Sequence, residues 1–339
     1  MIIRKAGTRA ALAVLVLALA LGSRETAGET MEPTLRLEAK IALGDVAGRI
    51  DHMAVDLARK RLFVAELGNN SVSVVDLLAR KVVHRITGLK EPQGVAYVQK
   101  HDTVVVANRG DGSVRFFNGG DYTLTGRVEL NSDADNIRVT STEDQIIVGY
   151  GEGALALIDV ATRAKLGDMP LKAHPENFQL DPSTSDVFVN LPDDRAMAVL
   201  DRLTGQQRNR WPMPYGGNFA MALDNERGRV LTVFRDPAKL MAFAKQNGRV
   251  EDQVATCGDV DDLFIDIKWQ RIYISCGEGF IDVRDAGRAG YPLLERINTV
   301  SGARTSYFIP EMDLYLLAVR AQAREPAAIW VYSVGEEHR

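Results

Sequence analysis

The stretch RIDHMAVD, residues 49–56, places three side chains that could carry chemistry within four positions of one another. These are Arg49, Asp51 and His52, and His52 beside a carboxylate could act as a general base. If the stretch opens a β-strand, however, Asp51 and His52 point to opposite faces, and Asp51 cannot easily orient its neighbour. The pattern favours a histidine on a polar rim over a local catalytic motif. The choice depends on the elements around it.

Those elements repeat along the chain. LFVAELGNNSVSVVD (62–76) aligns without a gap with VVVANRGDGSVRFFN (104–118), and five more segments share the plan of strand, turn and strand. The copies are spaced by 42, 41, 42, 43, 41 and 48 residues, and they end at Asp76, Asn118, Asp159, Asp201, Ala244, Asp285 and Ser333. Seven units of about 42 residues predict an all-β fold, a seven-bladed β-propeller with four-stranded blades.

Each unit is completed by an apolar inner strand before the hairpin and a more polar outer strand after it. The seventh unit lacks an outer strand, because the chain ends at SVGEEHR. We expect LRLEAKIAL (35–43) to supply it by pairing with IWVYSV (329–334), which closes the ring and removes open sheet edges. The longer last spacing predicts an insertion in the turn at 320–327.

The first 28 residues have the pattern of a cleaved signal peptide. A basic start, MIIRKAGTR, precedes the apolar run ALAVLVLALAL (11–21) and small residues, with cleavage expected between Ala20 and Gly28. A retained anchor is the alternative, although the run is shorter than the roughly 20 residues that a span needs. We therefore expect export to the periplasm or medium, and a single propeller domain over residues 29–339.

The strand–GNNSVSVVD unit resembles the YVTN-repeat family of β-propellers, the YncE-like exported bacterial proteins. The resemblance covers all seven repeats and the signal peptide, although blade five departs from it at RDPAKLMAFA (235–244). It implies the fold and export. It implies no catalytic motif, and a fold alone does not give a function.

In a propeller, the loops that enter the inner strands share one face with the loops inside the middle hairpins, around the mouth of the central channel. Polar residues gather at these positions, and we expect a ligand to contact them. The predicted ligand-binding residues are Arg49, Asp51, His52, Gln93, Arg109, Asn136, His174, Glu176, Asn177, Asn218, Asp262 and Arg304. Asp and Asn also cap strand ends and turns, so each of them could instead be structural.

Part of this set could hold a divalent cation. Ca²⁺ takes six to eight oxygen ligands, and three blades offer oxygens from Asp135, Asn136, Glu176, Asn177 and Asp262. The two histidines at the mouth are weaker evidence for a metal site than these oxygens. His52 and His174 are expected to face each other across the channel, too far apart for one ion without a bridging water or ligand, and no HxH or HExxH motif occurs.

The chain has two cysteines, Cys257 and Cys276. Export would place them where a disulfide can form, and they lie 19 residues apart around one predicted hairpin. The alternative is that they are two small buried residues.

The net charge of −4 and the scattered Lys and Arg argue against nucleic-acid binding, and no second segment could cross a membrane. Nucleotide-binding and α/β-hydrolase motifs are absent from the sequence. We therefore expect a monomeric, exported binding or interaction propeller that holds a small ligand or a periplasmic protein at its channel mouth. The alternative is a metal-assisted hydrolase or lyase, for example one that opens lactones, with its site at the same mouth.

Overall fold

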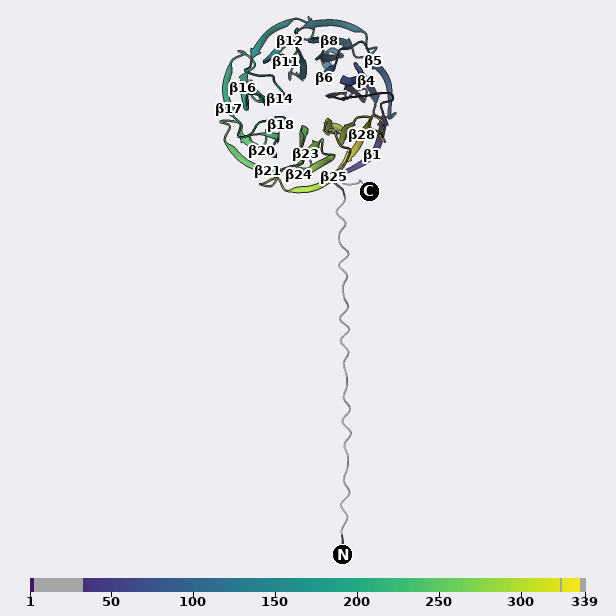
Figure 1. The fold of residues 1–339 in the computed structure, drawn as a ribbon, viewed down its shortest axis with the longest axis vertical. Coiled ribbons are helices and arrows are strands. Elements are labelled where there is room, and N and C mark those ends of the chain that lie inside the picture. Colours follow the sequence, from purple (N-terminus) through teal and green to yellow (C-terminus); the bar gives the residue numbers. More distant parts are fainter. Residues whose placement is uncertain (3–32, 324, 336–339) are drawn as a thin grey trace. The chain divides into compact units, whose positions relative to one another are not determined.

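Seven antiparallel four-stranded sheets surround a central axis in the computed structural model (Figure 1). The structure describes residues 1–2, 33–323 and 325–335. The contacts separate Met1–Glu32 from Pro33–Arg339, and the propeller belongs to the second unit. The predicted signal peptide lies almost entirely outside the described residues. Among the described residues, no helix combines the length and apolar character that a membrane span requires.

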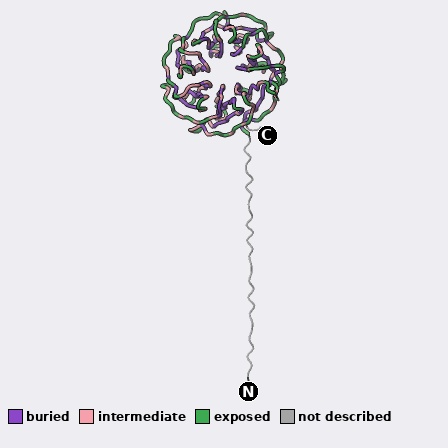
Figure 2. Tube along the Cα trace, in the orientation of Figure 1, coloured by how far each residue is buried: buried purple, intermediate pink, exposed green. Residues whose placement is uncertain are grey.

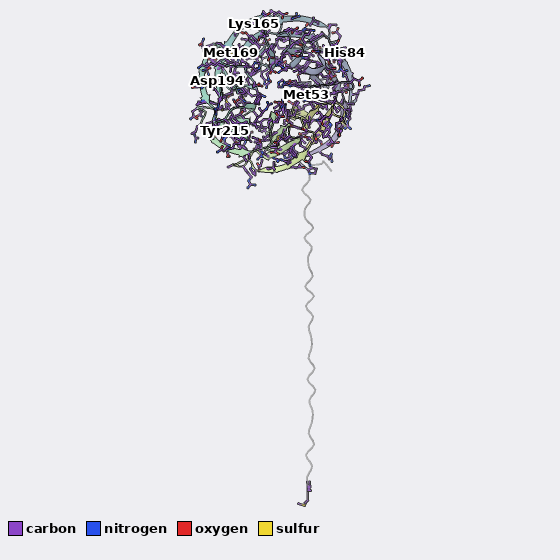
Figure 3. The ribbon with its side chains drawn as sticks, viewed as in Figure 1. Met53, His84, Lys165, Met169, Asp194 and Tyr215 are labelled. Carbon is purple, nitrogen blue, oxygen red and sulfur yellow. A yellow bond between two sulfur atoms is a disulfide. The ribbon has the colours of Figure 1, made fainter. Side chains whose placement is uncertain are left out.

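The inner strands run from the channel mouth to the opposite face of the ring. They are β2 (Met53–Asp56), β6 (Pro92–Val98), β10 (Ala134–Val139), β14 (Phe178–Leu180), β18 (Asn218–Asp224), β22 (Val260–Asp266) and β26 (Ser306–Ile309). Side chains of all seven blades line the central channel, and Met53 is labelled near the centre of the ring in Figure 3, whereas Asp194 and Tyr215 lie towards its rim.

The middle hairpins follow the inner strands, as the repeat predicts. Their first strands are β3 (Arg61–Glu66), β7 (Thr103–Asn108), β11 (Gln145–Tyr150), β15 (Asp186–Leu191), β19 (Arg229–Arg235), β23 (Arg271–Cys276) and β27 (Leu314–Val319). Their second strands are β4 (Ser71–Asp76), β8 (Ser113–Asn118), β12 (Ala154–Asp159), β16 (Ala196–Asp201), β20 (Ala238–Ala244), β24 (Phe280–Asp285) and β28 (Ala328–Val334). Three short 3₁₀ turns lie in or beside the hairpins: η1 (Leu67–Asn69), η2 (Gln99–His101) and η3 (Pro310–Met312).

The outer strands form the rim, where most residues are exposed or half-buried (Figure 2). They are β5 (Lys81–Ile86), β9 (Leu124–Glu129), β13 (Lys165–Pro170), β17 (Gln207–Pro212), β21 (Val250–Ala255), β25 (Leu293–Asn298) and β1 (Leu35–Ala42). The predicted ring closure is confirmed, since β1 pairs antiparallel with β28 from Leu35 opposite Val334 to Ala42 opposite Ala328.

The core lies between the blades. The described apolar residues form seven buried clusters, one at each contact between neighbouring sheets. Because each sheet is covered on both faces, its middle strands read as continuous apolar runs such as VVVA at 104–107. The ring thus holds the seven inner-strand starts in fixed positions around one axis.

Candidate functional site

The inner strands are irregular where they enter the ring. In four of them the ladder to the next strand shifts register at the mouth end, between Pro92 and Val95, Ala134 and Ile137, Asn218 and Ala220, and Val260 and Asp262. Such bulges re-aim side chains relative to simple alternation. At the second of them, Gly94 of the neighbouring blade lies so close to the Asp135 carbonyl that a Cβ would collide with it. Strand periodicity alone therefore does not predict the directions of the side chains at the mouth.

Asp135 is the centre of the mouth. Its carboxylate is 4% exposed, with Oδ1 3.6 Å from His52 Nε2 and Oδ2 3.8 Å from His174 Nε2. The Nδ1 of His174 donates to the Gly151 carbonyl at 2.6 Å. Both imidazoles thus lie near one carboxylate, which a blade between theirs supplies. The expectation that they lie too far apart to share an ion directly stays a prediction.

Asp51 also joins this group. Its Oδ2 lies 2.8 Å from Arg49 Nη2, and its Oδ1 lies 3.7 Å from His52 Nε2. The argument that Asp51 and His52 must point apart is wrong, because β2 begins only at Met53 and both residues precede the regular strand. We call Arg49, Asp51, His52, Asp135 and His174 the mouth network.

The shared carboxylate keeps both histidines protonated near neutral pH. Burial lowers the pKa of His52, but the adjoining Asp135 and Asp51 carboxylates outweigh it and raise this pKa to about 9. Asp135, helped by the Gly151 carbonyl, likewise raises the pKa of His174 to about 9 against a smaller effect of burial. For Asp135 itself, burial raises the pKa, yet the two imidazolium groups hold it well below its usual range.

Three further carboxyl groups at the mouth have raised pKa values. Burial raises the pKa of Asp51 to about 6, despite the opposing charges of His52 and Arg49. Burial also raises the pKa of Glu176 and of Asp262 to about 7 each. Displaced pKa values that cluster around one opening are typical of functional sites, although structural ion-pair networks produce them too.

A second charged cluster lies beside the mouth network. Arg235 and Arg304 both pair with Asp259 and Asp261, with Arg304 Nε 2.5 Å from Asp261 Oδ2. Arg235 also stacks on the Phe219 ring, 3.5 Å from its centroid. This cluster fixes the loops of blades five to seven next to the network.

Two hollows meet at this layer of charges. A cavity of about 580 Å³, here called the channel cavity, is lined by inner-strand residues from all seven blades. A hollow of about 30 Å³, here called the mouth hollow, lies among Arg49, Asp51, His52, Asp135, Asn136, Glu176, Asn177, Phe219, Asp261, Asp262 and Thr305. His52, Asn177 and Asp262 line both. Most of the available volume is thus in the channel, beneath the predicted mouth residues.

Apart from His174, which belongs to the mouth network, four predicted ligand-binding residues lie outside both hollows. Asn218 is fully buried, and its side-chain amide donates to Asn190 Oδ1 and to the Ala196 carbonyl of the neighbouring blade at 3.0 Å each. Gln93 is 6% exposed, Arg109 is half exposed and pairs with Asp133 at 3.5 Å, and Arg304 belongs to the second cluster. The remaining eight line the mouth hollow or belong to the mouth network.

The predicted calcium ligands are not gathered into a preformed site. Within the described part of the chain, no group of three or more His, Cys, Asp or Glu side chains is arranged to hold a metal ion. Asp135 is shared by two imidazoles, Asp262 Oδ2 accepts the Ser306 amide at 2.7 Å, and Asn177 Oδ1 accepts Arg138 Nη2 at 3.0 Å. A bound cation at this mouth stays a prediction.

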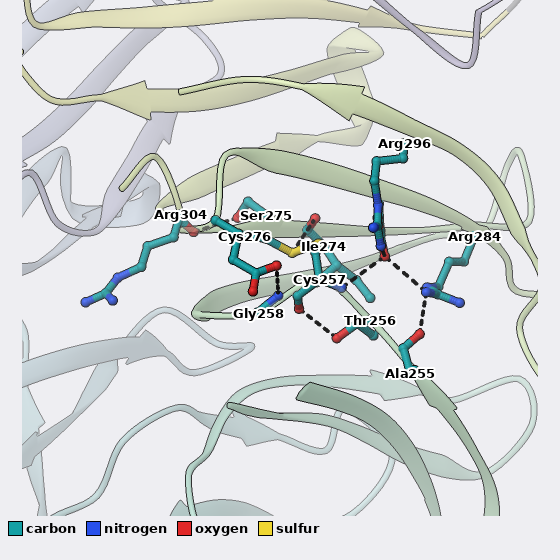
Figure 4. The surroundings of a disulfide bond; sticks show 12 residues. Ala255, Thr256, Cys257, Gly258, Ile274, Ser275, Cys276, Arg284, Arg296 and Arg304 are labelled. Carbon is teal, nitrogen blue, oxygen red and sulfur yellow. Dashed lines mark hydrogen bonds and ion pairs between the residues drawn. A yellow bond between two sulfur atoms is a disulfide. The ribbon is translucent and has the colours of Figure 1, made fainter. Parts of the chain in front are cut away.

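A disulfide ties one side of the mouth together. Cys257 and Cys276 are bonded, with their Cα atoms 5.8 Å apart, and Figure 4 shows the bond beside Gly258 and Arg304. The Gly258 amide donates to the Glu278 carboxylate at 2.8 Å. The start of β22, with Asp261 and Asp262, and the preceding Asp259 are therefore anchored to the end of β23.

Arg138 of β10 lines the channel cavity and is absent from the ligand-binding residues predicted from the sequence. A charged residue in a strand position that is apolar in most other blades was the available signal. Phe219, which lines the mouth hollow, is also absent from the predicted residues.

Comparison with known proteins supports the fold. The chain is similar to a solved hydrazine synthase chain of Kuenenia stuttgartiensis, with a TM-score of 0.71 and 13% identity over 85% of this chain and 97% of that chain. At this identity the likeness concerns the fold alone. No family profile and no curated protein matches. The β-propeller is thus confirmed, and the resemblance to YVTN-repeat proteins stays a prediction.

Proposed function

We propose that this protein is an exported β-propeller that binds a small ligand in its central channel, beneath the mouth network. The observation that carries the proposal is the channel cavity of about 580 Å³, which all seven blades line. Its volume lies within the roughly 300–1,000 Å³ of small-molecule sites. The sequence also allows a protein partner that binds at the channel mouth. Such a partner would contact the rim of the mouth, and its binding would not depend on the volume of the channel cavity.

The cavity has two chemically different parts. Its mouth end carries His52, Asn177 and Asp262. The wall beyond them has aliphatic residues such as Val55, Leu180, Ala222 and Ile265, interspersed with polar ones such as Gln179 and Asn225. Apolar surface combined with a few placed polar groups is the usual composition of a binding pocket. The polar groups would orient the ligand, and the wall would bury its apolar part.

Filling the channel should abolish ligand binding. Ala222 lines the cavity and is partly exposed to it, so Ala222→Trp places a large ring there. We expect ligands found by NMR screening of a small-molecule library against the mature protein to lose binding to this variant.

Leu78→Trp is the matched control, because Leu78 is 74% exposed and lies outside both hollows. It should bind like the wild type. Equal binding by the Ala222→Trp and wild-type proteins, or no ligand for the wild type, would contradict the channel proposal.

A metal-assisted hydrolase or lyase is the second candidate function. The approach of Asp51 and Asp135 to within 4 Å of His52 favours it, because an acid–base group needs such partners. This second function requires a divalent cation bound by the predicted calcium ligands.

We expect EDTA to leave the melting temperature of the mature protein unchanged, and elemental analysis to find calcium well below one ion per chain. The reason is that four of the five predicted ligands, Asp135, Asn136, Asn177 and Asp262, already have partners within the protein. A cation at 100 times its dissociation constant would add about 2.7 kcal/mol of stability, so its removal would be visible. Stoichiometric calcium together with a clear fall in melting temperature would favour the metalloenzyme instead.

A further inference from the structure

Arg138 differs from four other arginines around the channel, because it has no carboxylate partner among the described residues. Arg49, Arg109, Arg235 and Arg304 each pair with an aspartate. Arg138 lines the channel cavity, and among residues 33–323 and 325–335 no carboxylate lies within ion-pair distance of it. Buried or half-buried charges are normally paired, so this cation lacks the partner that its neighbours have.

The guanidinium of Arg138 is held in place by neutral acceptors. Its Nη1 donates to the Ile137 carbonyl at 2.9 Å and to Asn136 Oδ1 at 3.4 Å, and its Nη2 donates to Asn177 Oδ1 at 3.0 Å. A guanidinium has five N–H donors. The Nε–H and one N–H of Nη2 therefore have no acceptor in the described structure, and two donors on one guanidinium can bind a carboxylate in a fork.

The surroundings of Arg138 limit the charge of a partner. Asp262 and Asp135 attract the Arg138 cation from across the mouth end, while burial in the channel lowers its pKa. His52 adds a positive charge on the same lining. These carboxylates would repel an anion, and the repulsion grows with the charge of that anion. A singly charged group suits the position better than a dianion such as sulfate or phosphate.

We propose that the channel cavity binds a small monocarboxylic acid, whose carboxylate pairs with Arg138 and whose apolar part lies along the aliphatic residues of the wall. This inference rests on the proposed function and names its ligand class. Arg138 positions the head group, and Asn136 and Asn177 position Arg138. The aliphatic residues of the lining, such as Val55 and Ile265, would contact the apolar part of the acid.

The probes are sodium hexanoate and sodium benzoate, with hexanamide and benzamide as neutral counterparts of the same shape. Titration calorimetry on the mature wild-type protein should show the carboxylates binding at least about tenfold more tightly than the amides, since charged hydrogen bonds are the stronger ones. Sodium sulfate should compete weakly.

Two variants test the electrostatics in opposite directions. Arg138→Gln should weaken carboxylate binding by about 10- to 100-fold and leave amide binding nearly unchanged. Asp262→Asn removes a nearby negative charge and should strengthen carboxylate binding. Arg138→Lys keeps the charge without the fork and should fall between, which guards against a folding defect in Arg138→Gln. Arg127→Gln, on the half-exposed outer strand β9, is the control for net charge and should bind like the wild type.

The outcomes separate this inference from the proposed function. If the wild type binds acids and amides equally, and Ala222→Trp abolishes this binding, the carboxylate inference is overturned but the channel site is supported. The same conclusion follows if Arg138→Gln binds carboxylates as the wild type does, or if sulfate competes as well as hexanoate. Failure of every probe, together with failure of the library screen, would overturn both.

Discussion

Replacing Asp135 by asparagine is expected to lower the free energy of unfolding at pH 7 by about 3–5 kcal/mol, the usual cost of removing one partner of a buried ion pair. Asp135 is 4% exposed, and its two carboxylate oxygens face His52 and His174. Without this carboxylate, two largely buried imidazolium groups must lose their protons or remain unpaired. Urea unfolding followed by fluorescence measures the difference.

Asp133→Asn is the matched control. Asp133 lies two residues away, is 35% exposed, and pairs with the half-exposed Arg109 at 3.5 Å. Exposed ion pairs contribute about 0–1 kcal/mol, so this variant should stay close to the wild type. Equal effects of the two substitutions would show that Asp135 is not the centre of the mouth network.

The same variant should change how stability depends on pH. The folded pKa values of His52 and His174 are raised to about 9 from the ordinary 6.5. Their contribution is therefore complete below about pH 6.5 and is lost as the pH rises through about 9. The raised pKa values of Glu176 and Asp262, about 7 each, act in the same direction between about pH 4 and 7.

The wild-type protein should accordingly lose stability between about pH 6.5 and 9, and Asp135→Asn should show a flatter profile over this range. NMR titration of the His52 and His174 ring protons gives an independent reading, because their pKa values should fall in the variant. An unchanged slope with unchanged histidine titrations would contradict the assigned network.

Removing the disulfide is expected to have the second largest effect. The double variant Cys257→Ser, Cys276→Ser should lose about 2–4 kcal/mol, because the bond closes a loop with a sequence separation of 19 residues. The bond lies in the apolar cluster between blades five and six. Denaturation with and without dithiothreitol should show a reductant effect in the wild type alone.

Removing the disulfide should also loosen the chain at the channel mouth. The segment that carries Asp259, Asp261 and Asp262 would then be held by the Gly258–Glu278 bond and the Cys257 amide bond to Asp282, without the covalent link. Hydrogen exchange at the amides of residues 257–262 should be faster in the double variant. Equal stability and equal exchange would assign the two cysteines a packing role only.

The sequence by itself determined the blades. Alternating and continuous apolar runs, turn residues that tolerate positive φ, and a period of about 42 residues are local properties, so they located every sheet and the strand that closes the ring. The same reasoning brought His52, Asp135, His174 and Asp262 to one end of the channel, because inner-strand starts must share a face.

Only the tertiary structure decided which of these residues touch. Bulges at the strand starts and the close approach of Gly94 to Asp135 set side-chain directions that alternation cannot predict. They brought both histidines to one carboxylate and placed Asn218 between blades. Only the tertiary structure likewise decided that Arg138 has no carboxylate partner among the described residues, because whether an arginine in a strand has a counter-charge depends on residues of other blades. RIDHMAVD is thus one part of a network whose centre, Asp135, lies more than 80 residues further along the chain.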